Sequence, residues 1–376
     1  MYRPFARDSL LKSYRKLIKG SIDLGEEFMS EWLNPVGLDG MDFVEFADTD
    51  KIELTKVFTA FGFEKIADHK EKQIELWRQG DINFLLNTEP SGFAAEFCKM
   101  HGPSVCSMGF RVKNAPNAVE EVLSKDAKLY NEASKKSFLT DYPTIFGIGD
   151  SLIYFIDTYG TKGNIFEDEY NYLSDRREVK GKGFQRVDHL TNNVPAGDMQ
   201  KWCDWYSKVF NFQEKRYFDI HGSKTGLTSK VMMSPCRKIM IPVNEPSDGK
   251  SQIQEYLDEY KGSGVQHIAL LTNDIVSTLT DVRKEHDDFL NVPSTYYEDI
   301  PNRLDNVEEN LAVLEKLGIL VDGDEEGYLL QIFTQNLCGP IFFEVIERKN
   351  HHGFGEGNFQ ALFEAIERDQ ERRGVL

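Results

Sequence analysis

The pattern of hydrophobic and polar residues predicts the same succession of elements twice along the chain. A short strand entered through glycine is expected over residues 37–46, and another over residues 183–192. A helix follows each strand, because apolar residues then recur at helical spacing. These apolar positions are Leu54, Val57 and Phe58 in the first half, and Met199, Trp202, Tyr206, Val209 and Phe210 in the second.

The two predicted helices end in nearly copied turns, FGFEK at residues 61–65 and FNFQEK at residues 210–215. Gly62 and Asn211, at matching places in these turns, are the residue types that tolerate the left-handed conformation at a helix C-terminus. Later strands match as well, such as residues 105–112 and 265–272. The sequence therefore predicts an α+β fold made of duplicated modules, with curved mixed sheets, outer helices and a concave interior.

The repeat divides the chain into five expected parts. They are an N-terminal helical extension (1–34), a first module (35–165), a charge-rich linker (166–182), a second module (183–350) and a C-terminal helix (351–376). Apolar residues from Leu304 to Leu314 further predict one helix over residues 302–317, ended by Gly318. The C-terminal helix follows three closely spaced glycines, so we expect it to act as a lid with Phe359 in the mouth of the site.

Charge and composition exclude several classes of protein. The chain has 376 residues and a net charge of −18 from 44 basic and 62 acidic residues, so nucleic acid is not an expected partner. It contains no run of 18 apolar residues, so we expect no membrane span. The five cysteines are scattered and form no CxxC pair, which is typical of buried thiols in a reducing compartment. We therefore expect a cytoplasmic protein.

The first 20 residues leave a second location open. Arg3, Arg7 and four further basic residues face a single acid, Asp8, beside leucines and an isoleucine. This basic amphipathic segment is interpreted as a helix on the protein surface, and the alternative is an organelle transit peptide.

Three residues of the second half form a candidate metal site: His189, His267 and Glu344. Each is flanked by apolar residues in a predicted strand. A carboxylate in a buried strand is costly unless it is paired or binds a metal. Two imidazoles and one carboxylate are the ligand set that holds non-haem Fe(II) and leaves other positions open. The aligned first half carries Phe43 and Ser107 where the second carries the histidines, so we expect a site in the second module alone.

Several segments of the second half resemble the 4-hydroxyphenylpyruvate dioxygenase family, a branch of the vicinal-oxygen-chelate superfamily. They are residues 186–189, 251–254, 264–269, 327–334, 342–348 and 353–359. The resemblance is dense from residue 183 onward and weaker before it. It implies βαβββ modules that form two half-open mixed barrels. It also implies an Fe(II) cofactor and a reaction of 4-hydroxyphenylpyruvate with O2 that gives homogentisate and CO2 in tyrosine catabolism.

The resemblance also implies roles for individual residues. His189, His267 and Glu344 would ligate the iron, and Phe333 and Phe359 would enclose the aromatic ring of the substrate. Ser229, Asn244 and Gln252 would bind the phenol end. Catalytic roles would fall to Gln252, Gln266, Gln331 and Asn358. The complete implied substrate pocket comprises Ser229, Asn244, Gln252, Gln266, Gln331, Phe333, Phe342, Phe354, Asn358 and Phe359. A homo-oligomer, dimer or tetramer, is expected.

Three alternatives stay open at this point. A 4-hydroxymandelate synthase would use the same fold, iron and substrate but hydroxylate the benzylic carbon. An extradiol ring-cleaving dioxygenase would need an additional histidine or tyrosine base near the iron, and the predicted site strands offer no further histidine. A metal-free binding protein would not need the three candidate ligands.

Overall fold

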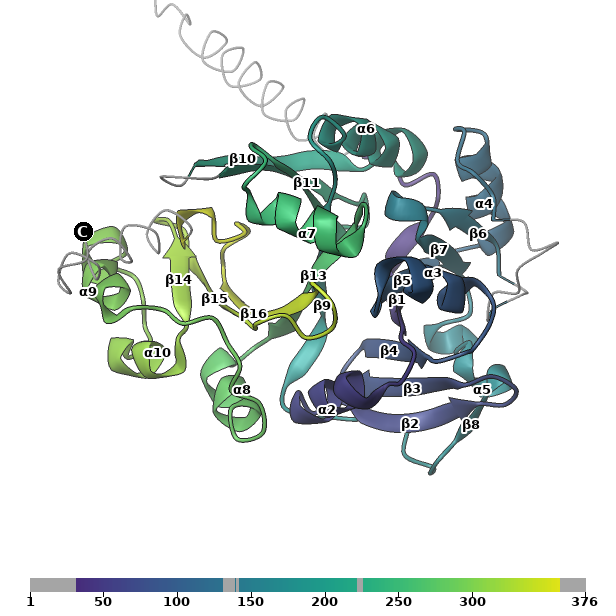
Figure 1. The fold of residues 1–376 in the computed structure, drawn as a ribbon, viewed down its shortest axis with the longest axis horizontal. Helices are drawn as coiled ribbons and strands as arrows, with labels where there is room; N and C mark the ends of the chain where they lie inside the picture. The colour runs from purple at the N-terminus through teal and green to yellow at the C-terminus, as the bar shows by residue number, and fades with distance from the viewer. Residues whose placement is uncertain (1–31, 131–138, 140–141, 222–225, 359–376) are drawn as a thin grey trace, which may run out of the picture.

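The computed structural model describes residues 32–130, 139, 142–221 and 226–358. The chain forms two eight-stranded mixed sheets that lie side by side, with helices on their outer sides (Figure 1). The predicted duplicated α+β architecture is therefore confirmed. Residues 1–31, with most of the expected N-terminal extension, and residues 359–376, with most of the expected lid, lie outside the described residues.

The first module holds the sheet with strand order β6-β7-β5-β1-β4-β3-β2-β8. Its strands are β1 (Leu38–Ala47), β2 (Glu64–His69), β3 (Ile74–Gln79), β4 (Ile82–Asn87), β5 (Ser104–Val112), β6 (Thr144–Phe146), β7 (Leu152–Ile156) and β8 (Tyr170–Tyr172). Its α-helices are α2 (Ile52–Ala60), α3 (Phe93–His101), α4 (Ala115–Leu123) and α5 (Phe166–Glu169).

Part of the expected linker at residues 166–182 belongs to this first module. Phe166 and Tyr170 are buried, and their rings pack edge to face with centroids 5.3 Å apart. Tyr170 begins β8, which pairs antiparallel with β2. The first sheet therefore continues to Tyr172. The charged residues around Phe166 and Tyr170 suggest a linker, because they outnumber these two apolar residues in the sequence.

The second module repeats this plan with the strand order β10-β11-β12-β9-β13-β16-β15-β14. Its strands are β9 (Phe184–Asn193), β10 (Gln213–His221), β11 (Gly226–Met233), β12 (Met240–Pro246), β13 (Gly264–Thr272), β14 (Leu320–Gly323), β15 (Tyr328–Phe333) and β16 (Phe342–Lys349). Its helices are α6 (Met199–Phe210), α7 (Gln252–Tyr260), α8 (Ile275–Val282), α9 (Ser294–Arg303) and α10 (Leu311–Leu317).

The single helix predicted over residues 302–317 is wrong. The segment contains only the end of α9 and the whole of α10. Asn310 caps α10 by accepting a hydrogen bond from the Ala312 N–H, and the Glu308 N–H donates to the Tyr328 hydroxyl. These polar contacts satisfy backbone groups outside a helix, which outweighs the apolar spacing of the intervening residues.

The interiors of the two modules differ. Phe43, Leu85 and Tyr154 belong to a buried apolar cluster of the first module that contains fifteen residues. The corresponding cluster of the second module consists of Ala269, Leu329 and Ile346 alone. The second interior therefore keeps room for other side chains and for a ligand.

Phe61 and Gln79 of the first module form much of the junction between the modules. The Phe61 ring packs against Phe343 of β16 at a centroid distance of 5.3 Å. The Gln79 amide donates to the Phe61 carbonyl, and its oxygen accepts from three successive N–H groups at residues 182–184, where β9 begins. A first-module side chain thus fixes the entry of the strand that later carries His189.

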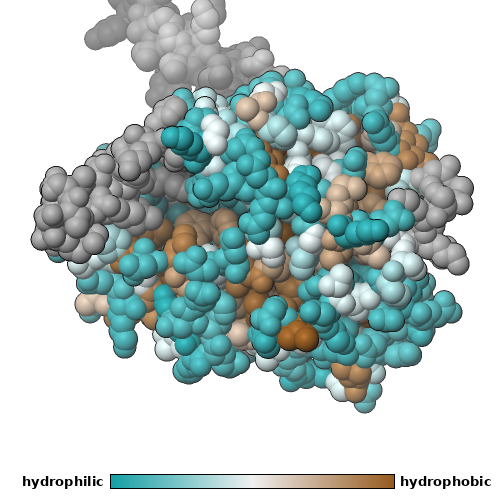
Figure 2. All heavy atoms as spheres, in the orientation of Figure 1, coloured by the Kyte–Doolittle hydropathy of each residue, from teal (hydrophilic) through white to brown (hydrophobic). Residues whose placement is uncertain are grey.

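Figure 2 shows a mainly hydrophilic surface, with apolar side chains gathered over the second sheet and between the modules. Within the described residues, no helix is both long and apolar enough to cross a membrane.

Candidate metal centre

Three neighbouring strands of the second sheet carry the predicted metal ligands. His189 lies on β9, His267 on β13 and Glu344 on β16, and β13 pairs with both of the others. Ala269 of β13 is opposite His189 on one side and Glu344 on the other. His267 precedes Ala269 by two residues, and side chains two apart point to the same face of a strand. The sheet register therefore directs all three side chains into the concave interior.

The ligand atoms of these residues converge. Glu344 Oε2 lies 3.2 Å from His189 Nε2 and 3.4 Å from His267 Nε2, and one ligand atom from each residue lies within 4.8 Å of the others. The side chains of His189 and Glu344 are 3% exposed. Glu344 Oε1 is buried without a hydrogen-bond partner in the described chain. A buried carboxylate oxygen without a partner is costly, and a bound cation would satisfy it.

The Nδ1 atoms face away from this cluster and are held by neighbours. His189 Nδ1 lies 2.8 Å from Asp188 Oδ1, and Arg348 donates to both oxygens of that carboxylate, at 3.0 Å to Oδ2 and 2.7 Å to Oδ1. His267 Nδ1 lies 3.1 Å from Gln266 Oε1. Acceptors at Nδ1 favour the tautomer in which Nε2 has a free lone pair, which is the form that binds metals.

The electrostatics agree with a cation site. Burial alone would raise the pKa of Glu344, but the positive charge of His189 and hydrogen bonds from both histidines lower it to about 2. Burial alone would lower the pKa of His189, but Glu344 and Asp188 raise it to about 9. Burial keeps the pKa of His267 below its usual value. The pKa values of His189 and Glu344 thus shift in opposite directions, because each group stabilises the charged form of the other.

A cavity of about 130 Å³ opens beside the three residues. Seven of the predicted pocket residues line it: Ser229, Asn244, Gln252, Gln266, Phe333, Phe342 and Phe354. Ser229 and Asn244 are opposite each other on β11 and β12. The ring of Phe342 stacks on His267 with centroids 4.9 Å apart. The wall of the cavity is thus largely neutral, with aromatic rings near the metal ligands.

Gln331 and Asn358 are buried and do not line the cavity, although Gln331 lies two residues before Phe333 on β15 and points to the same face of the sheet. Both amide atoms of Gln331 lack a hydrogen-bond partner in the described chain, and Gly355 leaves no room between them and its backbone for a side chain. Asn358 Oδ1 lies 2.5 Å from the Tyr296 hydroxyl. Phe359, the remaining predicted pocket residue, lies outside the described residues.

Other lining residues were not predicted from the sequence. They are Thr191, Phe218, Leu227, Val231, Pro242, Ile253, Leu290 and Glu356. Strand periodicity could have identified Thr191, which follows His189 by two residues and whose hydroxyl lies 2.9 Å from His267 Nε2. The apolar members carry no chemical signal, and only the folded sheet brings them together.

The equivalent place in the first module is filled. The strand register places Phe43 where the second module has His189, Ser107 where it has His267, and Tyr154 where it has Glu344. The rings of Phe43 and Tyr154 pack 5.7 Å apart. Gly109, opposite Phe43, is required here because a Cβ atom would lie 2.5 Å from the Phe43 ring. Apolar packing of Phe43 and Tyr154 thus occupies the place of His189 and Glu344, and Ser107, in the place of His267, donates a hydrogen bond to Glu45.

The arrangement in the second module fits a metal ion. It offers two imidazole nitrogens and one carboxylate on a single side, next to a cavity that leaves the opposite side open. Two imidazoles and one carboxylate with open positions beside them are a set that can hold a divalent transition metal.

Comparisons with known proteins agree with this organisation. Residues 32–171 match the family model described as "Hydroxyphenylpyruvate dioxygenase, HPPD, N-terminal". Residues 186–299 match the model of the "Glyoxalase/Bleomycin resistance protein/Dioxygenase superfamily". The two matches fall on the two modules of the repeat.

Two curated relatives and one solved structure extend these matches. Protein MelA of Shewanella colwelliana is 50% identical over 349 residues, which are 93% of this chain and 100% of that protein. A 4-hydroxyphenylpyruvate dioxygenase of Legionella pneumophila (strain Corby) is 47% identical over 346 residues, 91% of this chain and 98% of that protein. A mutant 4-hydroxymandelate synthase from Streptomyces coelicolor shares the fold, with a TM-score of 0.75 at 22% identity over 89% of this chain and 99% of that chain.

Proposed function

Because the chain belongs to the 4-hydroxyphenylpyruvate dioxygenase family, we propose that it converts 4-hydroxyphenylpyruvate and O2 to homogentisate and CO2. The observation that carries this proposal is the convergence of His189, His267 and Glu344 on a buried cavity whose remaining wall is mostly neutral. We propose these three residues as the ligands of one Fe(II) ion.

The bound iron would bring the 2-oxo acid and dioxygen together and allow the oxidative decarboxylation. The protein supplies the fixed ligand geometry. The pair of Arg348 and Asp188 orients His189, and Gln266 positions His267. The burial of His189 and Glu344 would exclude water from the side of the site that they form, which would limit side reactions.

The cavity wall would orient the substrate ring. Phe333 and Phe342 present their rings at 82° to each other with centroids 6.1 Å apart, and aromatic faces of this kind pack well against a phenyl ring. Phe359 is proposed as a further ring contact. At the phenol end, Ser229, Asn244 and Gln252 offer neutral donors and acceptors, which would bind a hydroxyl group without adding charge.

Of the remaining predicted residues, Gln266 would contact the carboxylate end of the substrate, and Gln331 and Asn358 would act indirectly, through the residues that they contact. We propose that Gln266 contacts the substrate directly, because it lines the cavity next to His267. The unpaired amide of Gln331, which packs against Gly355, and the amide of Asn358 do not line the cavity and would support Gly355 and the residues that follow it.

The cavity disfavours ring cleavage as the reaction. A ring-cleaving dioxygenase would need a histidine or tyrosine base beside the metal. Among the described lining residues, His189 and His267 are the only histidines and no tyrosine is present. 4-Hydroxymandelate synthesis uses the same substrate and metal, so the product distinguishes it.

Product identification tests the proposal. The protein loaded with Fe(II) is incubated with 4-hydroxyphenylpyruvate under air, and the products are separated by chromatography and identified by mass spectrometry. Homogentisate with one equivalent of CO2 is expected. The Glu344→Gln variant is the matched control and should give neither. 4-Hydroxymandelate, a cleaved ring, or no turnover by the iron-loaded protein would each overturn the proposal.

A further inference from the structure

A second cavity, of about 620 Å³, lies outside the barrel and gathers positive charge. Four of its lining residues are cationic: Arg186, Lys215, Arg237 and Arg348. Asp188 is its one acidic lining residue among those that the structure describes. The concentration of cations stands out in a chain whose net charge is −18.

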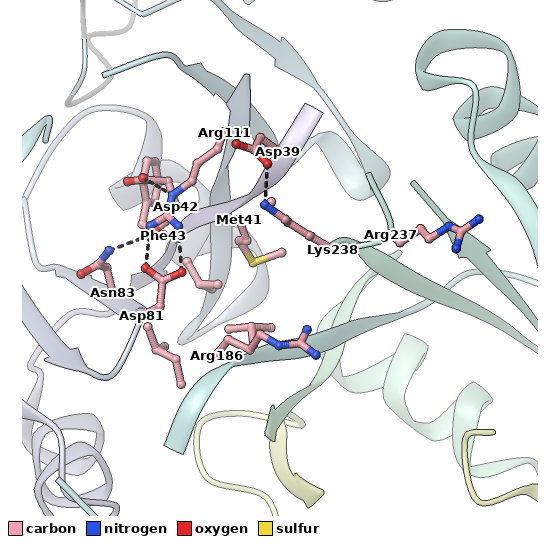
Figure 3. A pocket seen from close by; sticks show the side chains of 14 residues that line it. Asp39, Met41, Asp42, Phe43, Asp81, Asn83, Arg111, Arg186, Arg237 and Lys238 are labelled. Carbon is pink, nitrogen blue, oxygen red and sulfur yellow. Dashed lines mark hydrogen bonds and ion pairs between the residues drawn. The ribbon is translucent and has the colours of Figure 1, made fainter. Parts of the chain in front are cut away.

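This cavity joins a pocket of about 320 Å³ between the two modules, because Arg186 and Arg237 line both. Figure 3 shows the guanidinium groups of Arg186 and Arg237 on the same side, pointing away from the acidic residues of that pocket. The other cations of the pocket are paired. Lys238 lies 2.5 Å from Asp39, and Arg111 binds Asp42 and Asp81.

Arg186, Lys215 and Arg237 differ from these neighbours because no described carboxylate forms an ion pair with them. Arg348 is neutralised by Asp188. Lys215 contacts Gln213 and lies 4.0 Å from the centre of the Trp32 ring, and Arg237 lies 5.6 Å from the same ring. Burial and the charge of Arg237 lower the pKa of Lys215.

Cations held together without an acid repel one another, and a bound anion would relieve that repulsion. Arginine forks match the oxygen geometry of phosphate and carboxylate groups. We propose that this cavity, which we call the cationic cavity (Arg186, Lys215, Arg237 and Trp32), binds a small anion with at least two negative charges, a phosphate ester or a dicarboxylate. The site is separate from the metal centre, because Arg186 lies outside the barrel that encloses His189.

Calorimetric titration of the full metal-loaded chain tests this proposal. Inorganic phosphate is one probe and succinate the other, both at low ionic strength because exposed charges are screened by salt. The site variant is Arg186→Gln/Arg237→Gln. The matched control, Arg176→Gln/Arg177→Gln, removes two arginines from the exposed surface of the first module. Thermal unfolding verifies that each variant is folded, and Lys215→Gln provides an independent single change.

We expect saturable binding of one anion by the wild-type chain and the control variant. Loss of two charged contacts should weaken binding by at least about tenfold in the site variant. Stronger binding of phosphate would identify a phosphate ester, and stronger binding of succinate a dicarboxylate. The proposal is overturned if neither probe binds. Equal affinity in the site variant would also overturn it, because the anion would then bind elsewhere, for example at the metal.

Discussion

Arg348 donates two hydrogen bonds to the carboxylate of Asp188, and that carboxylate in turn lies 2.8 Å from Nδ1 of His189. In the first module Asp42, the residue before Phe43 and the equivalent of Asp188, also accepts a hydrogen bond from an arginine, but this arginine, Arg111, lies on β5 and not on the equivalent of β16. A buried aspartate paired with an arginine therefore occurs at this place in both modules, and in the second module the pair also orients a candidate metal ligand.

The first prediction follows from this comparison. Asp188→Asn should weaken metal binding by about 10–100-fold, because an amide no longer stabilises the required orientation and tautomer of His189. Competition between the protein and a chelating dye for Zn²⁺ or Fe(II) measures the change. Asp42→Asn is the control: it removes the equivalent buried carboxylate and should leave metal affinity unchanged. A similar loss of affinity in both variants would show that the effect is one of general stability.

The second prediction concerns Glu344. Glu344→Gln should reduce metal affinity by more than about 100-fold, because the neutral amide removes one of three ligands and its charge. The same dye competition measures it. Glu347→Gln is the matched control and should leave metal affinity unchanged. Glu347 lies on the same strand as Glu344 but on the other face of the sheet, where its carboxylate accepts a hydrogen bond from the Ile275 N–H. Normal metal affinity in Glu344→Gln would refute the ligand assignment.

The third prediction concerns the filled interior of the first module. Gly109→Ala should lower the free energy of unfolding by about 1–3 kcal/mol, because the added methyl group overlaps the Phe43 ring. Ala269, which faces His189 at the equivalent place, supplies the comparison. Ala269→Gly should cost about 1 kcal/mol or less through backbone entropy. Denaturant unfolding measures both, and a Gly109→Ala variant as stable as the wild type would contradict the assigned packing.

The fourth prediction concerns the junction. Phe61 is fully buried and packs on Phe343, whose neighbour in β16 is Glu344. Phe61→Ala should lower the free energy of unfolding by about 3–5 kcal/mol and also weaken metal binding. Phe58→Ala, which alters an equally buried ring within the first module, should destabilise comparably but spare metal affinity. If Phe61→Ala leaves metal affinity intact, the junction does not support the metal centre.

The fifth prediction concerns pH. Burial, followed by the charge of Lys72, lowers the pKa of His69 from 6.5 to about 4. In the folded protein its Nδ1 accepts hydrogen bonds from the N–H groups of Glu71 and Lys72. The unfolded chain therefore takes up a proton at higher pH than the folded protein, so stability should fall as pH decreases from 6.5 towards 4.

His69→Asn should flatten this part of the pH profile, since asparagine can accept the same hydrogen bonds without titrating. Denaturant unfolding at several pH values measures the profile. His352→Asn, a change at an exposed histidine, should leave the profile as it is in the wild type. An unchanged slope in His69→Asn would show that His69 does not contribute to the acid sensitivity.

Periodicity and the repeat predicted the main architecture. Gly62 and Asn211 adopt the positive φ values expected from their type, 84° and 59°, at the ends of α2 and α6. Residues whose conformation depends on distant partners could not be predicted in this way. The sequence around Tyr170 predicts a linker, whereas in the structure Tyr170 pairs with β2, a strand distant in the sequence. Asn310 caps a helix at a point where the apolar spacing predicts one continuous helix.

The convergence of His189, His267 and Glu344 could be predicted because buried polar residues in apolar strands carry a strong chemical signal, and their role as metal ligands stays a proposal. The rest of the apolar wall, beyond Phe333, Phe342 and Phe354, could not be predicted, because residues such as Phe218, Leu227 and Leu290 lie on separate elements and have no feature that distinguishes them from core residues. The close approach of Gly355 to the Gln331 amide, which does not line the cavity, is also shown only by the folded chain.

The position of Gln79 has a consequence for how the chain is made. The first module is synthesised before β9, and domains generally fold in the order in which they emerge from the ribosome. The side-chain oxygen of Gln79 then has no partner until the three backbone N–H groups of residues 182–184 reach it, and the Phe61 ring is not covered by Phe343 until β16 is in place. The first module would thus serve as a template for the second, and its Phe61 ring would stay uncovered until β16 forms.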